Sequence, residues 1–168
     1  MKFEIYCDGS TRGNGTSNAV GAWAWLVHEG GNIFHKGCQA EANTTNQRME
    51  LTAALKALEC VCHTYMTPFD KVIVYTDSAY LHNCYTQGWW RNWQMNGWKN
   101  SKKQPVANQD LWEKLIKYFE TPEVEFVKVK GHAGDEYNEI VDTMAQAASS
   151  SFKETLEDND GSSSYTSI

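Results

Sequence analysis

The segment DKVIVYTD, residues 70–77, sets the fold class of this chain. Its short continuous apolar run is typical of a central strand that is buried on both faces of a sheet. The residues that follow, SAYLHNCYTQ (78–87), predict a short helix, so a helix comes directly after the buried strand. This order predicts an α/β protein and puts Asp77 at the end of the strand.

The segments on the N-terminal side complete the antiparallel part of the sheet. KFEIYCD (2–8) alternates apolar and polar side chains as a half-buried strand does, and DGSTRGNGTSN (8–18) is typical of a turn-rich loop. Two further β-rich runs, 21–29 and 32–40, are separated by Gly30 and Gly31 and predict a hairpin.

The remaining segments predict helices and one more strand. A helical pattern covers about 45–65, with Thr44 or Thr45 as its N-cap, and a strand is predicted at 124–130. Two more helices are predicted at 108–119 and 135–149, while the Trp-rich segment between them and the central strand is ambiguous. The order predicts an α/β domain whose five-stranded mixed sheet has three antiparallel strands plus two parallel ones and is flanked by helices on both faces.

Composition predicts one domain with an acidic tail. We expect the domain to span 1–149 and the Ser-rich segment 150–168 to be disordered. The sequence contains no apolar stretch long enough for a membrane span and no recognisable signal peptide. Its five cysteines form no CxxC pair, which favours reduced thiols and a cytoplasmic location.

The charge is unevenly distributed along the chain. A formal net charge of −6 disfavours contact with phosphates. Half of that charge lies from Ser149 onward, a segment that contains four acidic residues and one lysine. Between Tyr80 and Gln109 there is no acid at all. That interval instead interleaves basic and aromatic side chains: Trp89, Trp90, Arg91, Trp93, Trp98, Lys99, Lys102 and Lys103. It predicts a basic, aromatic flank.

Four acids occupy positions that favour a shared site. Asp8 and Asp77 are each predicted to end a strand, and in parallel neighbouring strands their carboxylates would meet at the carboxyl edge of the sheet. Either one alone is more commonly a turn former or a helix cap. Glu50 and Asp142 lie on predicted helices beside apolar core positions, where a solvated surface acid is not expected.

Carboxylates gathered in this way would repel one another unless cations neutralised them. Oxygen ligands without sulfur select Mg²⁺ or Mn²⁺, and two such ions about 4 Å apart support in-line phosphodiester hydrolysis. The acids therefore predict metal-dependent phosphodiester hydrolysis.

Five segments, in order, resemble type 1 ribonuclease H over roughly residues 1–149. They are CDGSTRGNG, TTNQRMELTAAL, YTDSAYL, GWK…KKQPVANQDLW and VKGHAGDEYNEIVD. The resemblance implies a ribonuclease H-like fold and a monomeric endonuclease that cuts the RNA strand of RNA–DNA hybrids, leaving 3′-hydroxyl and 5′-phosphate ends. It also implies that Asp8, Glu50, Asp77 and Asp142 hold two Mg²⁺ ions, with Mn²⁺ as a substitute, and that His132 is the mobile histidine of the family.

The resemblance also implies how the hybrid is held. Residues Asn14, Asn46 and Gln47 match positions that contact the RNA minor groove, where the 2′-hydroxyl separates RNA from DNA. Thr45 and Asn108 match a pocket for a DNA phosphate. The DNA strand would meet an aromatic side chain, Trp89 or the competing Trp90, in a channel walled by Lys99, Lys102 and Lys103.

Two other functions remain open at this point. A binding module that kept the fold and lost the chemistry would lack at least one of the four acids, yet all four are present. An integrase or junction nuclease would need different spacings. Two departures from the family pattern, Asn43 and Ala79, predict weaker phosphate and minor-groove contacts but leave the acids untouched.

Overall fold

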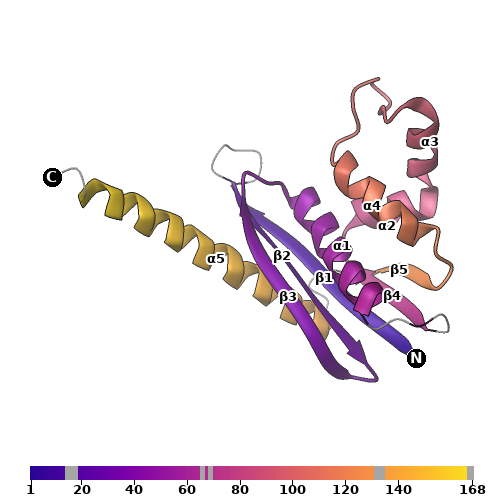
Figure 1. Cartoon of the computed structure of the whole chain (residues 1–168), viewed down its shortest axis with the longest axis horizontal. Helices are drawn as coiled ribbons and strands as arrows, with labels where there is room; N and C mark the ends of the chain where they lie inside the picture. Colours follow the sequence, from indigo (N-terminus) through magenta and orange to yellow (C-terminus); the bar gives the residue numbers. More distant parts are fainter. Residues whose placement is uncertain (14–18, 65–66, 68–69, 131–134, 166–168) are drawn as a thin grey trace.

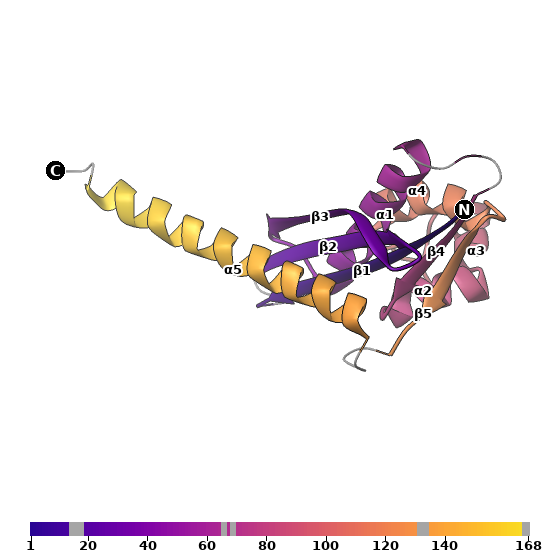
Figure 2. The same cartoon turned by 90° about the horizontal axis from the view of Figure 1, so that it is seen from below.

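The computed structural model describes residues 1–13, 19–64, 67, 70–130 and 135–165, and side chains as far as residue 155. Five strands and five helices lie within these ranges (Figures 1 and 2). The strands are β1 (Lys2–Arg12), β2 (Val20–Glu29), β3 (Asn32–Ala42), β4 (Lys71–Thr76) and β5 (Val124–Lys128). The helices are α1 (Asn46–Thr64), α2 (Ala79–Gln87), α3 (Trp89–Asn96), α4 (Gln109–Phe119) and α5 (Glu136–Tyr165).

The five strands form one mixed sheet in the order β3-β2-β1-β4-β5. The pairs β1–β2 and β2–β3 are antiparallel, whereas β1–β4 and β4–β5 are parallel. The predicted α/β class, with three antiparallel strands plus two parallel ones, is confirmed.

Helices cover both faces of the sheet, as predicted. Figure 2 shows α5 along one face and α1, α2 and α4 on the other. The alternation of β1 explains the two layers, because Phe3, Ile5 and Cys7 join the larger core with α1 and α4, while Tyr6 joins a smaller core with Val141 of α5. Asp8 follows Tyr6 by two residues and therefore shares its face.

Local signals account for the helix boundaries. Thr45 is the cap of α1, since its Oγ1 accepts a hydrogen bond from the Arg48 amide at 3.2 Å. Ser78 caps α2 in the same way through the Leu81 amide, at 3.1 Å. The ambiguous Trp-rich segment contains the short helix α3, which ends at Gly97 in the left-handed conformation with φ 75°.

Helix α5 is longer than the sequence predicts. The sequence predicts a helix that ends at 149 and a disordered tail after it, but α5 continues to Tyr165. Its C-terminal half projects beyond the sheet in Figure 1. The helix begins on the sheet with Val141 and Ala145 buried, and its alanine-rich middle favours propagation past that contact. No helix in the described part of the chain is both long and apolar enough to cross a bilayer.

Candidate active site

The candidate site lies in a notch where β4 ends and β1 continues. Strand β1 pairs with β4 only from Lys2 to Tyr6, but it pairs with β2 as far as Arg12. The prediction that Asp8 ends its strand is therefore wrong, because antiparallel pairing with β2 extends the strand through residues that favour turns. Asp77, in contrast, does follow the last residue of β4. The early end of β4 leaves the Asp8 side of β1 open.

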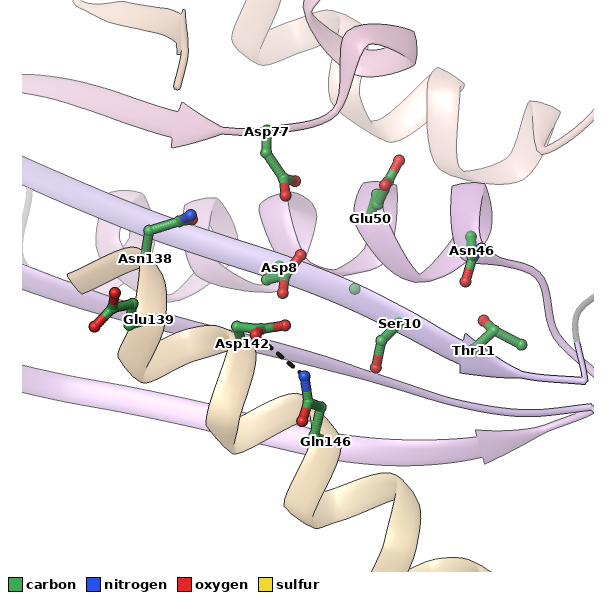
Figure 3. Close-up of a pocket in the computed structure, with 11 residues that line it drawn as sticks. Asp8, Ser10, Thr11, Asn46, Glu50, Asp77, Asn138, Glu139, Asp142 and Gln146 are labelled. Carbon is green, nitrogen blue, oxygen red and sulfur yellow. Dashed lines mark hydrogen bonds between the residues drawn. The ribbon is translucent and has the colours of Figure 1, made fainter. Parts of the chain in front are cut away.

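The notch contains a cavity of about 300 Å³, and all four predicted acids line it (Figure 3). In Figure 3, Asp77 points from the end of β4 toward Asp8, and Asp142 approaches from α5. Glu50 extends from α1 beside them, and Asn46 lies one turn before it on the same helix. Four segments that are distant in sequence thus contribute carboxylates to one space.

Asp8 lies deepest among the acids, with 9% of its surface exposed. Its burial, the negative charge of Asp77 and a hydrogen bond with Asp142 raise the pKa of Asp8 to about 8. Burial also raises the pKa of Glu50, with the charge of Asp77 adding to the rise and a hydrogen bond with Ser78 opposing it. These carboxyl groups are therefore costly to ionise together.

Close packing of two backbones brings Glu50 to Asp8. A Cβ atom built at Gly9 would lie 2.3 Å from the carbonyl carbon of Met49 and 2.4 Å from the amide nitrogen of Glu50. Any side chain larger than hydrogen would push β1 and α1 apart. Gly9 is thus the residue that lets the helix carrying Glu50 approach the strand carrying Asp8.

Sequence reasoning missed several polar residues that line the cavity. Gln146 donates a hydrogen bond from Nε2 to Oδ2 of Asp142 at 3.1 Å. It lies four residues after Asp142, and Asn138, which is buried, lies four residues before it. That helical spacing is the signal that could have identified both. The other lining residues are Gly9, Ser10, Thr11 and Glu139.

The donor set of the cavity fits a hard divalent cation. Its described lining contains carboxylate, amide and hydroxyl oxygens and no lysine or arginine. A cation would relieve the repulsion that raises the pKa of Asp8. Within the described residues, no three His, Cys, Asp or Glu side chains are already arranged around one ion position. Ion binding would therefore draw the carboxylates together from these positions.

The two residues predicted to form a phosphate pocket share one neighbour, Arg48. Its amide donates to Thr45, and its Nη1 donates to Oδ1 of Asn108 at 3.4 Å. The guanidinium group also forms an ion pair with Asp110, with 2.6 Å between Nη2 and Oδ2. Asn108 adopts φ 62° directly before α4. The structure thus brings Thr45 and Asn108 together beside an arginine that sequence reasoning did not select.

The predicted aromatic and basic residues lie apart from the cavity. Trp90 is buried and packs against Phe119, whereas Trp89 is half-buried and donates from Nε1 to Gln87. Trp89 is therefore the more accessible of the two competing tryptophans. The predicted basic residues, Lys99, Lys102 and Lys103, are all exposed.

Three further residues are predicted to contact the substrate or to assist its cleavage. Asn14 and His132 lie outside the described residues. Gln47 is exposed on the first turn of α1 and does not line the cavity. Their assignments stay predictions.

The fold and the acid-lined notch together define a class of α/β proteins with a carboxylate site at the end of a mixed sheet. A model of the RNase H family matches residues 1–150. Relatives named Ribonuclease H are 45% identical in Syntrophomonas wolfei and 43% identical in Caldanaerobacter subterraneus, over 144 and 146 residues. These matches cover 86% and 84% of this chain, and 93% and 87% of the relatives.

Solved structures agree with the family match. The crystal structure of LC9-RNase H1, a type 1 RNase H with the type 2 active-site motif, is 28% identical with a TM-score of 0.74, over 89% of this chain and 72% of the other. The RNase H domain of PFV has the same fold, with a TM-score of 0.70 at 21% identity over 88% of this chain and 93% of the other. The chain belongs to the RNase H family of enzymes.

Proposed function

We propose that this chain is an endonuclease that hydrolyses the RNA strand of RNA–DNA hybrids. One observation carries the proposal: the carboxylates of Asp8, Glu50, Asp77 and Asp142 line a single cavity. The described lining of that cavity contains no lysine or arginine that could neutralise them. A related structure, LC11-RNase H1, is described as a complex with an RNA/DNA hybrid, at 22% identity and a TM-score of 0.63 over 89% of this chain and 97% of the other.

The four carboxylates would hold two Mg²⁺ ions, with Mn²⁺ as a possible replacement. When bound, such ions supply an activated water and neutralise the charge on the leaving oxygen, giving 3′-hydroxyl and 5′-phosphate ends. Burial first, and then the negative charge of Asp77, raises the pKa of Asp8, so a bound cation would favour the ionised form of this carboxyl group. Gln146 holds one oxygen of Asp142 and so restricts the rotation of that side chain.

The residues around the acids would select a hybrid. Asn46 lines the cavity beside Glu50, where its amide can pair with a 2′-hydroxyl, and Gln47 and Asn14 are proposed to extend this contact. Thr45 and Asn108, bridged by Arg48, are proposed to bind a phosphate of the DNA strand. His132 is proposed to assist proton transfer or product departure, since an imidazole titrates near neutral pH.

Further contacts with the DNA strand would come from the aromatic and basic flank, residues 89–103. Trp89 is proposed as the side chain that contacts DNA sugars, and Lys99, Lys102 and Lys103 as the phosphate contacts. We further propose that the enzyme acts as a monomer in the cytoplasm, in keeping with its five free cysteines.

One assay tests the proposal. Purified protein is incubated with end-labelled RNA–DNA hybrid, RNA duplex or DNA duplex, with Mg²⁺, Mn²⁺ or a chelator. We expect cleavage of the RNA strand of the hybrid alone, and only with a divalent cation. Hybrid binding without cleavage would instead support a non-catalytic binding module. Equal cleavage of all three duplexes would contradict the proposed specificity.

A further inference from the structure

The three exposed lysines lie on one short loop, residues 97–106, which we call the basic hairpin. Its ends are fixed to the protein core. The Trp98 amide donates to the Trp93 carbonyl at 2.8 Å, and the amide of buried Val106 donates to the Trp98 carbonyl at 3.0 Å. The Trp98 ring also packs on Trp93, with 5.9 Å between ring centroids. The base of the hairpin is thus held by the main chain and by aromatic packing.

Asn96, the last residue of α3, holds the first strand of the hairpin. Its Nδ2 donates to the Lys99 carbonyl at 3.0 Å, and its Oδ1 accepts from the Lys99 amide at 3.0 Å. Both polar ends of one side chain therefore bind the backbone of a single residue. Because Asn96 binds only the backbone of Lys99, these two hydrogen bonds do not involve the Lys99 ammonium group.

Asn100 holds the tip in a similar way. Its Oδ1 accepts from the amides of Lys102 and Gln104, at 2.9 and 3.0 Å. Its backbone also exchanges bonds across the tip, donating to the Gln104 carbonyl at 2.8 Å and accepting from the Lys103 amide at 2.9 Å. Four hydrogen bonds thus converge on one exposed turn, where Lys103 has a left-handed φ of 61°.

These contacts need an explanation beyond stability. The hairpin is exposed between Lys99 and Pro105 apart from half-buried Asn100, so it adds little to the core. Three positive charges on a short loop repel one another and favour a spread ensemble. Ordering such a loop costs free energy on binding unless the free protein already holds the bound arrangement.

We propose that Asn96 and Asn100 are positioning residues, which preset the ammonium groups of Lys99, Lys102 and Lys103 for the phosphates of one nucleic-acid backbone. The inference rests on the proposed function, because it takes the RNA–DNA hybrid as the ligand. It adds that affinity depends on two neutral side chains that need not touch the ligand.

The experiment separates positioning from charge. Binding of a fluorescent hybrid to the full chain is measured in chelator, which prevents cleavage, over a series of salt concentrations. The variants are Asn100→Ala, the partial replacement Asn100→Ser, the charge variant Lys102→Gln, and Asn92→Ala as a matched control from the exposed face of α3. Amide exchange of Lys102 and Gln104 reports directly on the Asn100 contacts.

Asn100→Ala is expected to weaken binding about tenfold at every salt concentration, because the loop must now be ordered on binding. The slope of log Kd against log salt stays unchanged, since the same phosphates are still contacted. Exchange at Lys102 and Gln104 accelerates, Asn100→Ser recovers part of the affinity through its hydroxyl, and Asn92→Ala matches wild type. Lys102→Gln, in contrast, weakens binding and lowers the slope.

Two results would overturn the inference. One is an Asn100→Ala affinity equal to that of Asn92→Ala despite faster exchange at Lys102 and Gln104. The other is a slope that falls as it does in Lys102→Gln, since Asn100 would then act on the number of phosphate contacts. Failure of the wild type to bind any hybrid is a distinct outcome, which would contradict the proposed function and remove the ligand assigned to the hairpin.

Discussion

The acidic cavity and the basic hairpin are built in opposite ways. The cavity gathers carboxylates from positions 8, 50, 77 and 142, so it exists only when the sheet and both helix layers are assembled. The hairpin is held by side-chain hydrogen bonds between residues two to four positions apart. The difference teaches that the proposed chemistry depends on the whole fold, whereas the arrangement of the lysines on the hairpin depends on local sequence. The two functions can therefore be disturbed separately.

The largest effect is expected from removing one charge in the cavity. Asp77→Asn should lower the rate of hybrid cleavage about a thousandfold or more, as loss of a catalytic group commonly does. Binding of the hybrid should survive, because the hairpin is untouched. Initial rates with Mg²⁺ and fluorescence anisotropy in chelator measure the two quantities. The matched control Glu125→Gln removes an exposed charge of β5 and should cleave normally; cleavage at that level by Asp77→Asn would remove Asp77 from the site.

A second variant disturbs the cavity through the backbone alone. In Gly9→Ala the added methyl group would collide with the backbone of Met49 and Glu50, so β1 and α1 must separate. We expect the free energy of unfolding to fall by about 1–3 kcal/mol, measured by urea denaturation, with a clear loss of cleavage. Gly30→Ala is the control, since a Cβ there meets no atom within 4 Å although its φ is 55°. It should cost only about 1 kcal/mol and leave cleavage unchanged, and an equally active Gly9→Ala would contradict the role of the close approach.

Reversing charge on the hairpin should affect the ligand and not the chemistry. We expect Lys102→Glu combined with Lys103→Glu to raise KM roughly tenfold and to flatten its dependence on salt, while kcat stays close to that of wild type. Steady-state kinetics over a salt series check this. A changed kcat with an unchanged KM would show that the two regions are not separable in this way.

The smallest effect concerns a strained residue at the tip of the hairpin. Lys103 has φ 61°, a conformation that costs a side chain about 1–2 kcal/mol and that glycine adopts freely. Lys103→Gly should therefore raise the free energy of unfolding by less than about 1 kcal/mol, since glycine also loses more entropy on folding. The same variant should bind the hybrid more weakly through its lost charge. A destabilised variant would show that the Lys103 side chain itself supports the hairpin.

Periodicity predicted the five strands and four of the five described helices, whereas the Trp-rich segment that contains α3 stayed ambiguous and strand pairing decided where β1 ends. In the helix predicted at about 45–65, Leu51, Leu55 and Leu58 are spaced for one face and all three are buried. The strand end at Asp8 was wrong because pairing with β2 outweighs the turn preference of the local sequence. Composition likewise favoured a disordered tail after 149, where the structure has a continuing helix.

The candidate site shows a similar division. The four acids could be selected because Asp8 and Asp77 were each predicted to end a strand and Glu50 and Asp142 adjoin apolar core positions. All four line the cavity. Arg48 could not be selected, because its contact with Asn108 depends on tertiary geometry that spacing does not encode. Asn100 contacts residues of its own loop, but an asparagine in a loop does not by itself predict those contacts. Gly9 was likewise indistinguishable from a turn glycine until its distance from α1 was known.

The protonation of Asp8 links the cavity to pH. Burial first, and then the charge of Asp77, raises its pKa to about 8 from an unfolded value near 3.9. Between these values the folded metal-free protein holds a proton that the unfolded chain has lost. This contribution to the free energy of unfolding is therefore fully present below about pH 4 and is lost as pH rises toward 8. Mg²⁺ should raise the Tm more at pH 8 than at pH 5, because it then competes with fewer protons.

Calorimetric titration of Mg²⁺ into the protein at pH 7 tests this account most directly. Two buffers with different ionisation enthalpies report the protons released. We predict saturable binding with proton release in the wild type, and loss of both in Asp8→Asn. Binding by Asp8→Asn equal to that of the wild type would contradict the assignment of the four carboxylates as the metal site. Saturable wild-type binding without proton release would instead show that Asp8 is already ionised at pH 7.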